Sequence, residues 1–175
     1  MRRKSSPAFT LMELMIAVAI MMILSAVGLG SFWQSQKKSR DTQRKSDLSQ
    51  IGRALEMFNE DFYQYPESDG GNMLGCQNEA EGIFVACTVG GEFAAYPGGV
   101  KQIYMKKFPG DPQGGFSYYY TEEGSGFALY SVLENDQDAS YHATGWDASG
   151  TGSGDECGGN ACRYKLVDYG VIYPD

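Results

Sequence analysis

Near its N-terminus the chain reads Phe9-Thr-Leu-Met-Glu-Leu-Met-Ile-Ala-Val-Ala-Ile-Met-Met-Ile-Leu-Ser-Ala-Val-Gly-Leu-Gly-Ser-Phe-Trp33, a stretch of 25 residues that is almost entirely apolar. As an α-helix it would extend about 37 Å at 1.5 Å per residue, which exceeds the roughly 30 Å of a bilayer's hydrocarbon core. The stretch therefore predicts a membrane-spanning helix. Because Arg2, Arg3 and Lys4 precede it, and positive flanks of a first span stay in the cytoplasm, we expect the rest of the chain outside.

One carboxylate, Glu13, interrupts the apolar stretch near its beginning. An acidic residue inside a span is by default a functional-site hypothesis, and it needs a cationic partner. A small-residue junction with polar residues before it and apolar residues after it occurs at Pro7-Ala8-Phe9. Cleavage between Ala8 and Phe9 would create an α-ammonium group four residues before Glu13. We expect this amine, in the same chain or in a neighbour, to be the partner of Glu13.

The segment Ser6-Pro-Ala-Phe-Thr-Leu-Met-Glu-Leu-Met15, followed by the apolar stretch, resembles the N-terminus of type IV pilins and of the pseudopilins of type II secretion. The resemblance implies cleavage before Phe9 by a prepilin peptidase and N-methylation of Phe9. It also implies that Glu13 meets the Phe9 amine of an adjacent subunit during filament assembly.

The segment departs from the family pattern at two points. Ala8 stands where the family usually has glycine before the cleavage point, and the span lacks the proline that many members carry. Gly28 and Gly30 each cost a helix about 1 kcal/mol relative to alanine. We predict that these two glycines replace the proline as a site of local unwinding.

After Trp33 the chain changes to a polar segment, residues 34–46, whose charged residues are mostly basic: Lys37, Lys38, Arg40, Arg44 and Lys45. We interpret the segment as a solvated helical face that continues a helix begun in the membrane. The alternative is that its cations meet anionic lipid before assembly and the acidic heads of neighbouring subunits afterwards.

From residue 48 the apolar residues recur at helical spacings of 3, 4, 3 and 4, at Leu48, Ile51, Leu55, Phe58 and Phe62. This spacing predicts one apolar face that packs against a globular head. Pro66 is a plausible stop, so the whole helix is expected from about Thr10 to about Phe62.

Strands are predicted in the C-terminal part, where aromatic and β-branched residues alternate with glycine-rich separators: Phe116–Thr121, Phe127–Leu133 and Tyr164–Tyr173. They are expected to form an antiparallel meander. Residues 67–100 are expected to form a long connecting loop with at most one short helix. The phrase from Val100 to Gly115 resembles the one that leads into the sheet of major pseudopilins and related pilins. Its part from Lys106 to Pro112 favours a major pseudopilin, whereas the second cysteine pair near the C-terminus favours a surface pilin.

The predicted fold class is therefore α+β and pilin-like. A long N-terminal helix spans the membrane with its first half and packs with its second half on a small antiparallel sheet. Residues 1–8 are predicted to be a cytoplasmic leader and 9–33 the transmembrane and assembly helix. Residues 34–65 would continue the helix, and 66–175 would form a disulfide-bonded head.

Four cysteines lie in the part that we expect outside the cytoplasm, which favours two disulfides over metal or redox chemistry. Of the three connectivities, we expect Cys76 with Cys87 and Cys157 with Cys162, because each pair encloses a local loop containing Gly and Asn. A zinc site is disfavoured, since the spacings lack a Cys-x-x-Cys knuckle and the sole histidine, His142, is distant in sequence.

A calcium site is the one metal hypothesis that the sequence supports. Asp136-Gln-Asp138-Ala-Ser140 alternates oxygen ligands as a calcium loop does, and Asp147 falls at the twelfth position. An EF-hand would need glycine at Tyr141, so we favour a solvated acidic loop. A looser calcium site is the alternative, which the resemblance to major pseudopilins implies. We expect no other cofactor.

Charge and composition exclude several functions. Residues 1–46 carry a net charge of +6 and residues 47–175 a net charge of −14, which argues against direct nucleic-acid binding by this subunit. His142 is expected to be a surface residue, and the serines have no partner base for a catalytic triad. We therefore predict a structural protein rather than an enzyme.

The predicted function is that of a structural subunit of a type IV pilus-like filament, with a role in adhesion, motility or protein secretion. The precursor would be a single-pass protein of the inner membrane with a cytoplasmic N-terminus, and the mature form would lie in an extracellular or periplasmic filament. Its partners would be other copies of itself, prepilin peptidase, an inner-membrane assembly platform and minor pilins. The alternatives are a major pseudopilin of a type II secretion system and a monomeric membrane-anchored binding module.

Overall fold

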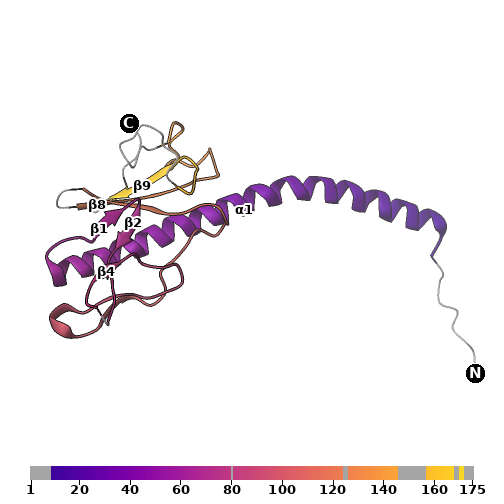
Figure 1. The fold of residues 1–175 in the computed structure, drawn as a ribbon. Helices are drawn as coiled ribbons and strands as arrows, with labels where there is room; N and C mark the ends of the chain where they lie inside the picture. The colour runs from indigo at the N-terminus through magenta and orange to yellow at the C-terminus, as the bar shows by residue number, and fades with distance from the viewer. Residues whose placement is uncertain (1–8, 80, 124–125, 146–156, 168–169, 172–175) are drawn as a thin grey trace, which may run out of the picture. The chain divides into compact units, whose positions relative to one another are not determined.

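The computed structural model describes residues 9–79, 81–123, 126–145, 157–167 and 170–171. A single long helix, α1 (Leu11–Phe62), precedes a series of short strands, as Figure 1 shows. The chain divides into two compact units, Met1–Lys37 and Lys38–Asp175. The predicted extent of the helix and the α+β class are confirmed.

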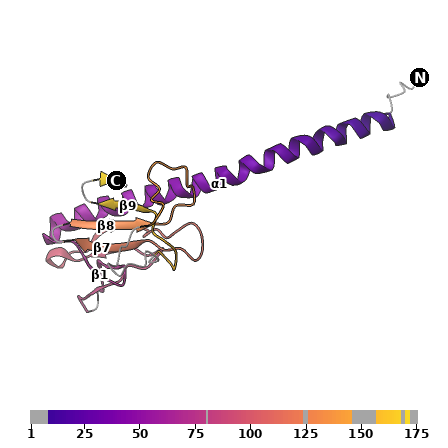
Figure 2. The same cartoon turned by 90° about the horizontal axis from the view of Figure 1, so that it is seen from above.

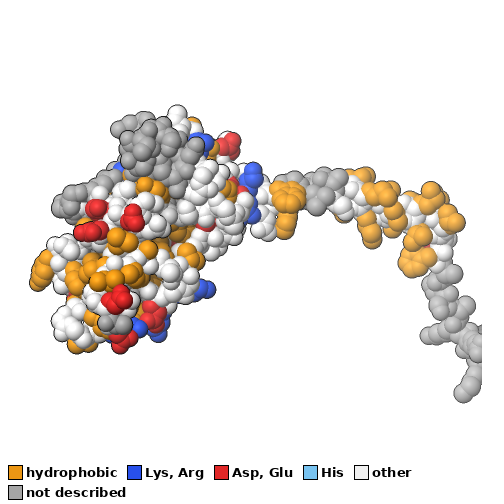
Figure 3. Space-filling view, in the orientation of Figure 1, with side chains coloured by type: hydrophobic (Ala, Val, Ile, Leu, Met, Phe, Trp, Pro, Cys, Tyr) orange, Lys and Arg blue, Asp and Glu red, His pale blue; other side chains and the backbone are white. Residues whose placement is uncertain are grey.

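The first unit contains the N-terminal part of α1. Its described apolar side chains are exposed, from Leu11 through Leu24 and again at Phe32 and Trp33 (Figure 3). The helical backbone continues through Gly28 and Gly30, so local unwinding there stays a prediction. Among the residues whose structure is described, no helix is both long enough and apolar enough to cross a membrane.

In the second unit, one face of α1 forms half of the hydrophobic core. Leu48, Ile51, Leu55 and Phe58 are each at most 1% exposed, which confirms the face that the 3, 4, 3, 4 spacing predicted. These side chains pack against the sheet residues Tyr120, Phe127 and Leu129, and Phe62 lies at the margin of the same cluster. The helix and the sheet are therefore two layers around one core.

The main sheet has four antiparallel strands in the order β10-β9-β8-β7. Their bounds are β7 (Tyr119–Glu123), β8 (Gly126–Ser131), β9 (Tyr164–Val167) and β10 (Gly170–Val171). Figure 2 shows β7, β8 and β9 side by side, in agreement with the register Tyr120↔Leu129↔Leu166. The predicted antiparallel meander is confirmed, but its bounds differ, since β7 begins and ends later than predicted. The one strand predicted over Tyr164–Tyr173 is wrong, because β9 and β10 are two strands that pair with each other.

Both faces of the main sheet are covered. All six residues of β8 are buried. The face away from α1 packs Ala128, Tyr130 and Val167 in a second small cluster with the disulfide of Cys157 and Cys162. Because both faces are covered, β8 lacks the strict alternation of apolar and polar residues that marks a half-exposed strand.

The expectation of one long loop over residues 67–100 is wrong. The region forms three two-stranded antiparallel pairs, which extend to residue 105. They are β1 (Glu67–Asp69) with β2 (Asn72–Leu74), β3 (Cys76–Gln77) with β4 (Phe84–Val85), and β5 (Phe93–Ala95) with β6 (Gln102–Met105). A 3-10 turn, η1 (Pro97–Gly99), joins the last two strands. Strands of two to four residues are too short to give a periodic signal.

Candidate assembly site

The start of α1 is closed by reciprocal hydrogen bonds between Thr10 and Glu13. The backbone N–H and the hydroxyl of Thr10 donate to Glu13 Oε2 at 2.9 and 2.8 Å. The backbone N–H of Glu13 donates to Thr10 Oγ1 at 3.2 Å. This is a capping box, in which Thr10 is the N-cap and Glu13 the third helical residue. A negative side chain is also favourable at this position because the helix N-terminus carries partial positive charge.

The capping box holds the Glu13 carboxylate at Thr10, which directly follows Phe9, the residue that cleavage would make the new N-terminus. Phe9 precedes Thr10 directly and its side chain is exposed, whereas Ala8 lies outside the described residues. None of the three bonds uses Glu13 Oε1. In the single chain, therefore, the structure brings Glu13 to Thr10, and the pairing of Glu13 with an amine stays a prediction.

A second polar site, which we call the helix–loop clamp, lies in the second unit. It consists of α1 residues Arg40, Arg44, Lys45 and Asp41 together with Asp111, Glu134 and Asp138. Arg44 is its centre and is fully buried.

The Arg44 guanidinium contacts three carboxylates at once. Its Nε and Nη2 donate to the two oxygens of Asp111 at 2.7 and 2.8 Å, which is a bidentate pair. Its Nη1 donates to Asp41 at 2.8 Å and to Glu134 at 2.7 Å. The guanidinium also lies 5.3 Å from the centre of the Phe116 ring. The charge of Arg44 is therefore satisfied in a site from which water is excluded.

The segment after β8 is bonded to α1 through both its backbone and its side chains. The Asp41 carboxylate accepts the backbone N–H groups of Glu134 and Asn135, the latter at 2.8 Å. Arg40 makes a bidentate pair with Glu134 at 2.7 and 2.5 Å. Hydrogen bonds from Arg40 and then Arg44 outweigh burial and lower the pKa of Glu134 to about 2.

Lys45 completes the clamp at Asp138. Its Nζ lies 2.5 Å from Asp138 Oδ1 and 3.3 Å from Ser140 Oγ. The same Asp138 oxygen accepts the backbone N–H of Ser140 at 2.9 Å. Burial alone would raise the pKa of Asp138, but the bonds from Lys45 and Ser140 lower it overall.

The clamp corrects the interpretation of residues 34–46 as a solvated face. Arg44 and Asp41 are buried, and Arg40 and Lys45 are bonded to acidic residues about 90 positions later in the chain. The sequence contains no local signal for such pairs, because the carboxylates come from distant loops. Within the described residues, Lys37 and Lys38 are the exposed cations of this segment without an ion pair.

The residues predicted to bind calcium are not brought together. Asp138 is bonded to Lys45, and Asp136 is exposed and accepts a bond from the Gln137 amide at 3.4 Å. Asp147 lies outside the described residues. In the described part of the chain, no group of three His, Cys, Asp or Glu side chains could hold a metal ion.

The cysteines are joined as Cys76–Cys87 and Cys157–Cys162, with Cα atoms 5.1 and 5.4 Å apart. The first bond links β3 to the residues just after β4, and the second lies fully buried on the far face of the main sheet. Each disulfide thus closes a local loop.

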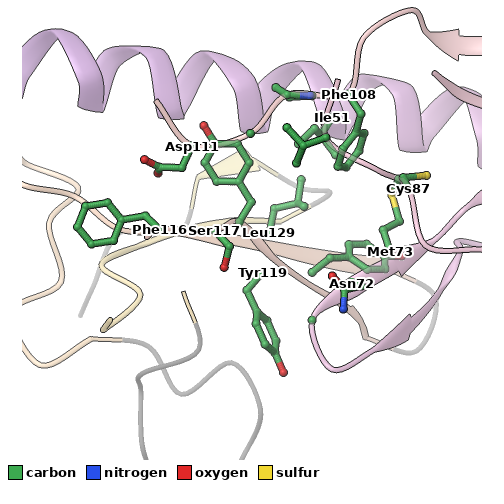
Figure 4. A pocket seen from close by; sticks show the side chains of 16 residues that line it. Ile51, Asn72, Met73, Cys87, Phe108, Asp111, Phe116, Ser117, Tyr119 and Leu129 are labelled. Atoms are coloured by element: carbon green, nitrogen blue, oxygen red, sulfur yellow. The ribbon is translucent and has the colours of Figure 1, made fainter. Parts of the chain in front are cut away.

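A small pocket lies between α1 and the residues that lead into β7. Figure 4 shows Ile51, Phe108 and Met73 at one end of it and Asp111 and Phe116 at the other. Its volume of about 140 Å³ is below the roughly 300 to 1,000 Å³ of small-molecule sites. The pocket has the size of one apolar side chain rather than of a cofactor.

The polar groups near this pocket are engaged with one another. The Tyr118 hydroxyl donates to Asp47 at 2.9 Å. Burial raises the pKa of both Asp47 and Tyr118, so both side chains favour their neutral forms more than they would in water.

The ring of His142 lies elsewhere, with Nδ1 3.4 Å from Thr144 Oγ1.

Comparison with known proteins gives a consistent result. Residues 3–29 match the family model described as the prokaryotic N-terminal methylation motif. The chain is 30% identical over 134 residues to type II secretion system core protein G of Pseudomonas aeruginosa, covering 75% of this chain and 86% of the relative. It is 29% identical over 115 residues to the protein of the same name from Klebsiella michiganensis, covering 66% and 73%. No solved structure matches the chain.

The motif match covers the segment that contains Ala8, Phe9 and Glu13, and the similarity to core protein G extends over most of both chains. The long helix and the antiparallel sheet of the second unit agree with it. The chain belongs to the type IV pilin and pseudopilin family.

Proposed function

We propose that the chain is a major pseudopilin, the structural subunit of the filament of a type II secretion system. This function was the alternative in the sequence analysis, where a pilus subunit came first. The similarity over 134 residues to core protein G favours it, because the relatives found carry that name. The phrase Lys106–Pro112 supports the same assignment.

The N-terminal site suggests how a subunit would pass from membrane to filament. Cleavage before Phe9 would create an ammonium group next to the Thr10–Glu13 capping box. In an apolar surrounding, a donor with a full positive charge attracts a carboxylate more strongly than a neutral donor does. The Phe9 amine of a neighbouring copy would therefore compete for the Glu13 carboxylate, which is bonded to the neutral donors of Thr10 before assembly.

The first unit supplies the surface for the remaining contacts. Its apolar side chains are exposed in the single chain, and they need either lipid or other helices around them. The first unit would anchor the precursor in the inner membrane until the helices of other copies cover its apolar side chains in a periplasmic filament. Prepilin peptidase, an inner-membrane assembly platform and minor subunits are the further partners that this function requires.

The assembly role is tested by replacing Glu13 with Gln and with Val. Gln can still form a capping box but carries no charge, so this variant tests the charge of residue 13 while the helix cap is kept. Both variants are expected to insert in the membrane and to give filament yields at least tenfold below normal. Glu60→Gln, on an exposed position of the same helix, is the matched control and should assemble normally. A normal filament yield from Glu13→Gln would contradict the pairing of Glu13 with an amine.

Deletion of the gene distinguishes the two kinds of filament. If the chain is a pseudopilin, proteins destined for the outside should accumulate in the periplasm, and re-expression should restore their release. Loss of surface filaments with unchanged protein release would instead support a surface pilus.

A further inference from the structure

We propose that the segment from Glu134 to His142 is held on α1 by the side-chain cations of the helix–loop clamp, in the place where the sequence pattern suggested a calcium ion. The clamp would then fix the head to the helix without a metal. This inference concerns the stability of the second unit and does not depend on the type of filament.

Two of the three acidic side chains of this segment, Glu134 and Asp138, already have cationic partners. Glu134 is bonded to the guanidinium groups of Arg40 and Arg44, and Asp138 to the ammonium group of Lys45. The side chains of Glu134 and Asp138 are 15% and 22% exposed, so solvent screens these pairs less than it would screen surface pairs. The three helix cations face four carboxylates, those of Asp41, Asp111, Glu134 and Asp138.

A calcium ion at Asp138 would meet unfavourable groups. Calcium requires six to eight oxygen ligands at about 2.3 to 2.6 Å. The Lys45 ammonium stands 2.5 Å from Asp138 Oδ1, so a calcium ion bound to the same oxygen would lie within about 5 Å of the ammonium, and the two positive charges would repel each other. The Ser140 backbone N–H also points at this oxygen, and a donor N–H cannot bind a cation.

The backbone N–H groups of this segment bond partly to α1 and partly within the segment itself. Its N–H groups at Glu134 and Asn135 donate to Asp41, and the Asp138 N–H donates to the Asn135 carbonyl at 3.2 Å. The Tyr141 N–H donates to the Asp138 carbonyl at 3.0 Å. These bonds fold the segment as a compact turn in which the carboxylates of Glu134 and Asp138 face α1.

The experiment uses the full mature chain in detergent micelles and measures the melting temperature by circular dichroism. The normal protein is melted with calcium and with a chelator, and terbium luminescence reports ion binding. Tyr164, whose ring lies 5.4 Å from Lys45 Nζ, would sensitise a terbium ion bound at Asp138. Lys45→Met removes one clamp cation. Lys38→Met, an exposed lysine on the same helix, is its control.

We expect the same melting temperature, within about 1 °C, with calcium and with chelator. Lys45→Met should melt about 3 to 6 °C lower, and Lys38→Met should be unchanged. Asp138→Asn should also melt lower, because it removes the partner of Lys45. Calcium that raises the melting temperature of the normal protein but not that of Asp138→Asn would overturn the proposal. A Lys45→Met variant as stable as Lys38→Met would overturn it as well.

Discussion

At the scale of the residue, Arg44 shows how a charge can be stable in a protein interior. Its side chain is fully buried, and it makes bonds to Asp41, Asp111 and Glu134. Burial disfavours a charged guanidinium, but the surrounding carboxylates more than compensate and raise the pKa of Arg44. Asp111 belongs to the phrase that leads into the main sheet and Glu134 to the segment that leaves it. One side chain thus holds the segment before β7 and the segment after β8 on the helix.

Replacing Arg44 with Met should lower the free energy of unfolding by about 3 to 5 kcal/mol. The substitution leaves the Asp111 carboxylate buried without its partner, which is the costly way to break a buried ion pair. Urea unfolding of the detergent-solubilised chain, followed by circular dichroism, measures the change. Arg53→Met is the control, because Arg53 is exposed and bonds only weakly with Ser49. A loss below about 1 kcal/mol would show that the clamp contributes little to stability.

At the scale of the element, α1 shows which parts of the fold the sequence could predict. The spacing of Leu48, Ile51, Leu55 and Phe58 predicted the buried face, because helical periodicity is a local property. The clamp residues could not be predicted, since each cation pairs with a carboxylate from a distant loop. The capping box Thr10-x-x-Glu13 is a local signal that we overlooked, because Glu13 was considered only as a partner for an amine.

The short strands also show the difference between local sequence signals and contacts between distant residues. Asp69-Gly-Gly-Asn72 is a hairpin signal, with Gly70 and Gly71 both at positive φ, as a two-residue turn of the I′ type requires. It was present in the sequence, but β1 and β2 have only three residues each and no alternation to accompany it. The far-face cluster around Cys157 and Cys162 is a tertiary contact with no sequence period.

The C-terminus of α1 allows a test at this scale. Tyr63 follows the last helical residue with φ of 57°, and its N–H donates to the Asn59 carbonyl at 2.8 Å, which is a left-handed cap. Glycine adopts this conformation without the steric cost that other residues carry. Because the Tyr63 side chain is 91% exposed, little packing is lost on its removal.

Tyr63→Gly should therefore raise the free energy of unfolding by about 1 kcal/mol. Tyr63→Ala removes the same ring but keeps the steric cost, so it should bring no gain. Thermal melts of the three proteins under identical conditions give the comparison. Equal stability of the Gly and Ala variants would indicate that Tyr63 is not strained.

At the scale of the whole molecule, the clamp predicts how stability depends on pH. The pKa of Glu134 is lowered from 4.5 to about 2, and the pKa of Asp138 is lowered too. A carboxylate with a lowered pKa stabilises the fold above its unfolded pKa and loses this contribution as pH falls through the folded value. Asp47, whose pKa is raised by burial, acts in the opposite direction.

The free energy of unfolding should fall by up to about 3 kcal/mol between about pH 4.5 and pH 2 because of Glu134 alone. Glu134→Gln should be less stable than the normal protein at neutral pH and should show a shallower decline in acid. Urea unfolding over this pH range tests both expectations. Parallel pH profiles for the two proteins would exclude Glu134 as the source of the decline.

Filament function also belongs to the whole molecule, since it requires that the N-terminal site and the head work in one processed chain. The most direct test is the intact mass of the protein, extracted without reduction from cells that carry prepilin peptidase. We predict a mass that lacks residues 1–8, gains one methyl group and loses four hydrogens to the two disulfides. A mass that retains Met1 to Ala8 would contradict the account, because an unprocessed chain has no Phe9 amine to pair with Glu13.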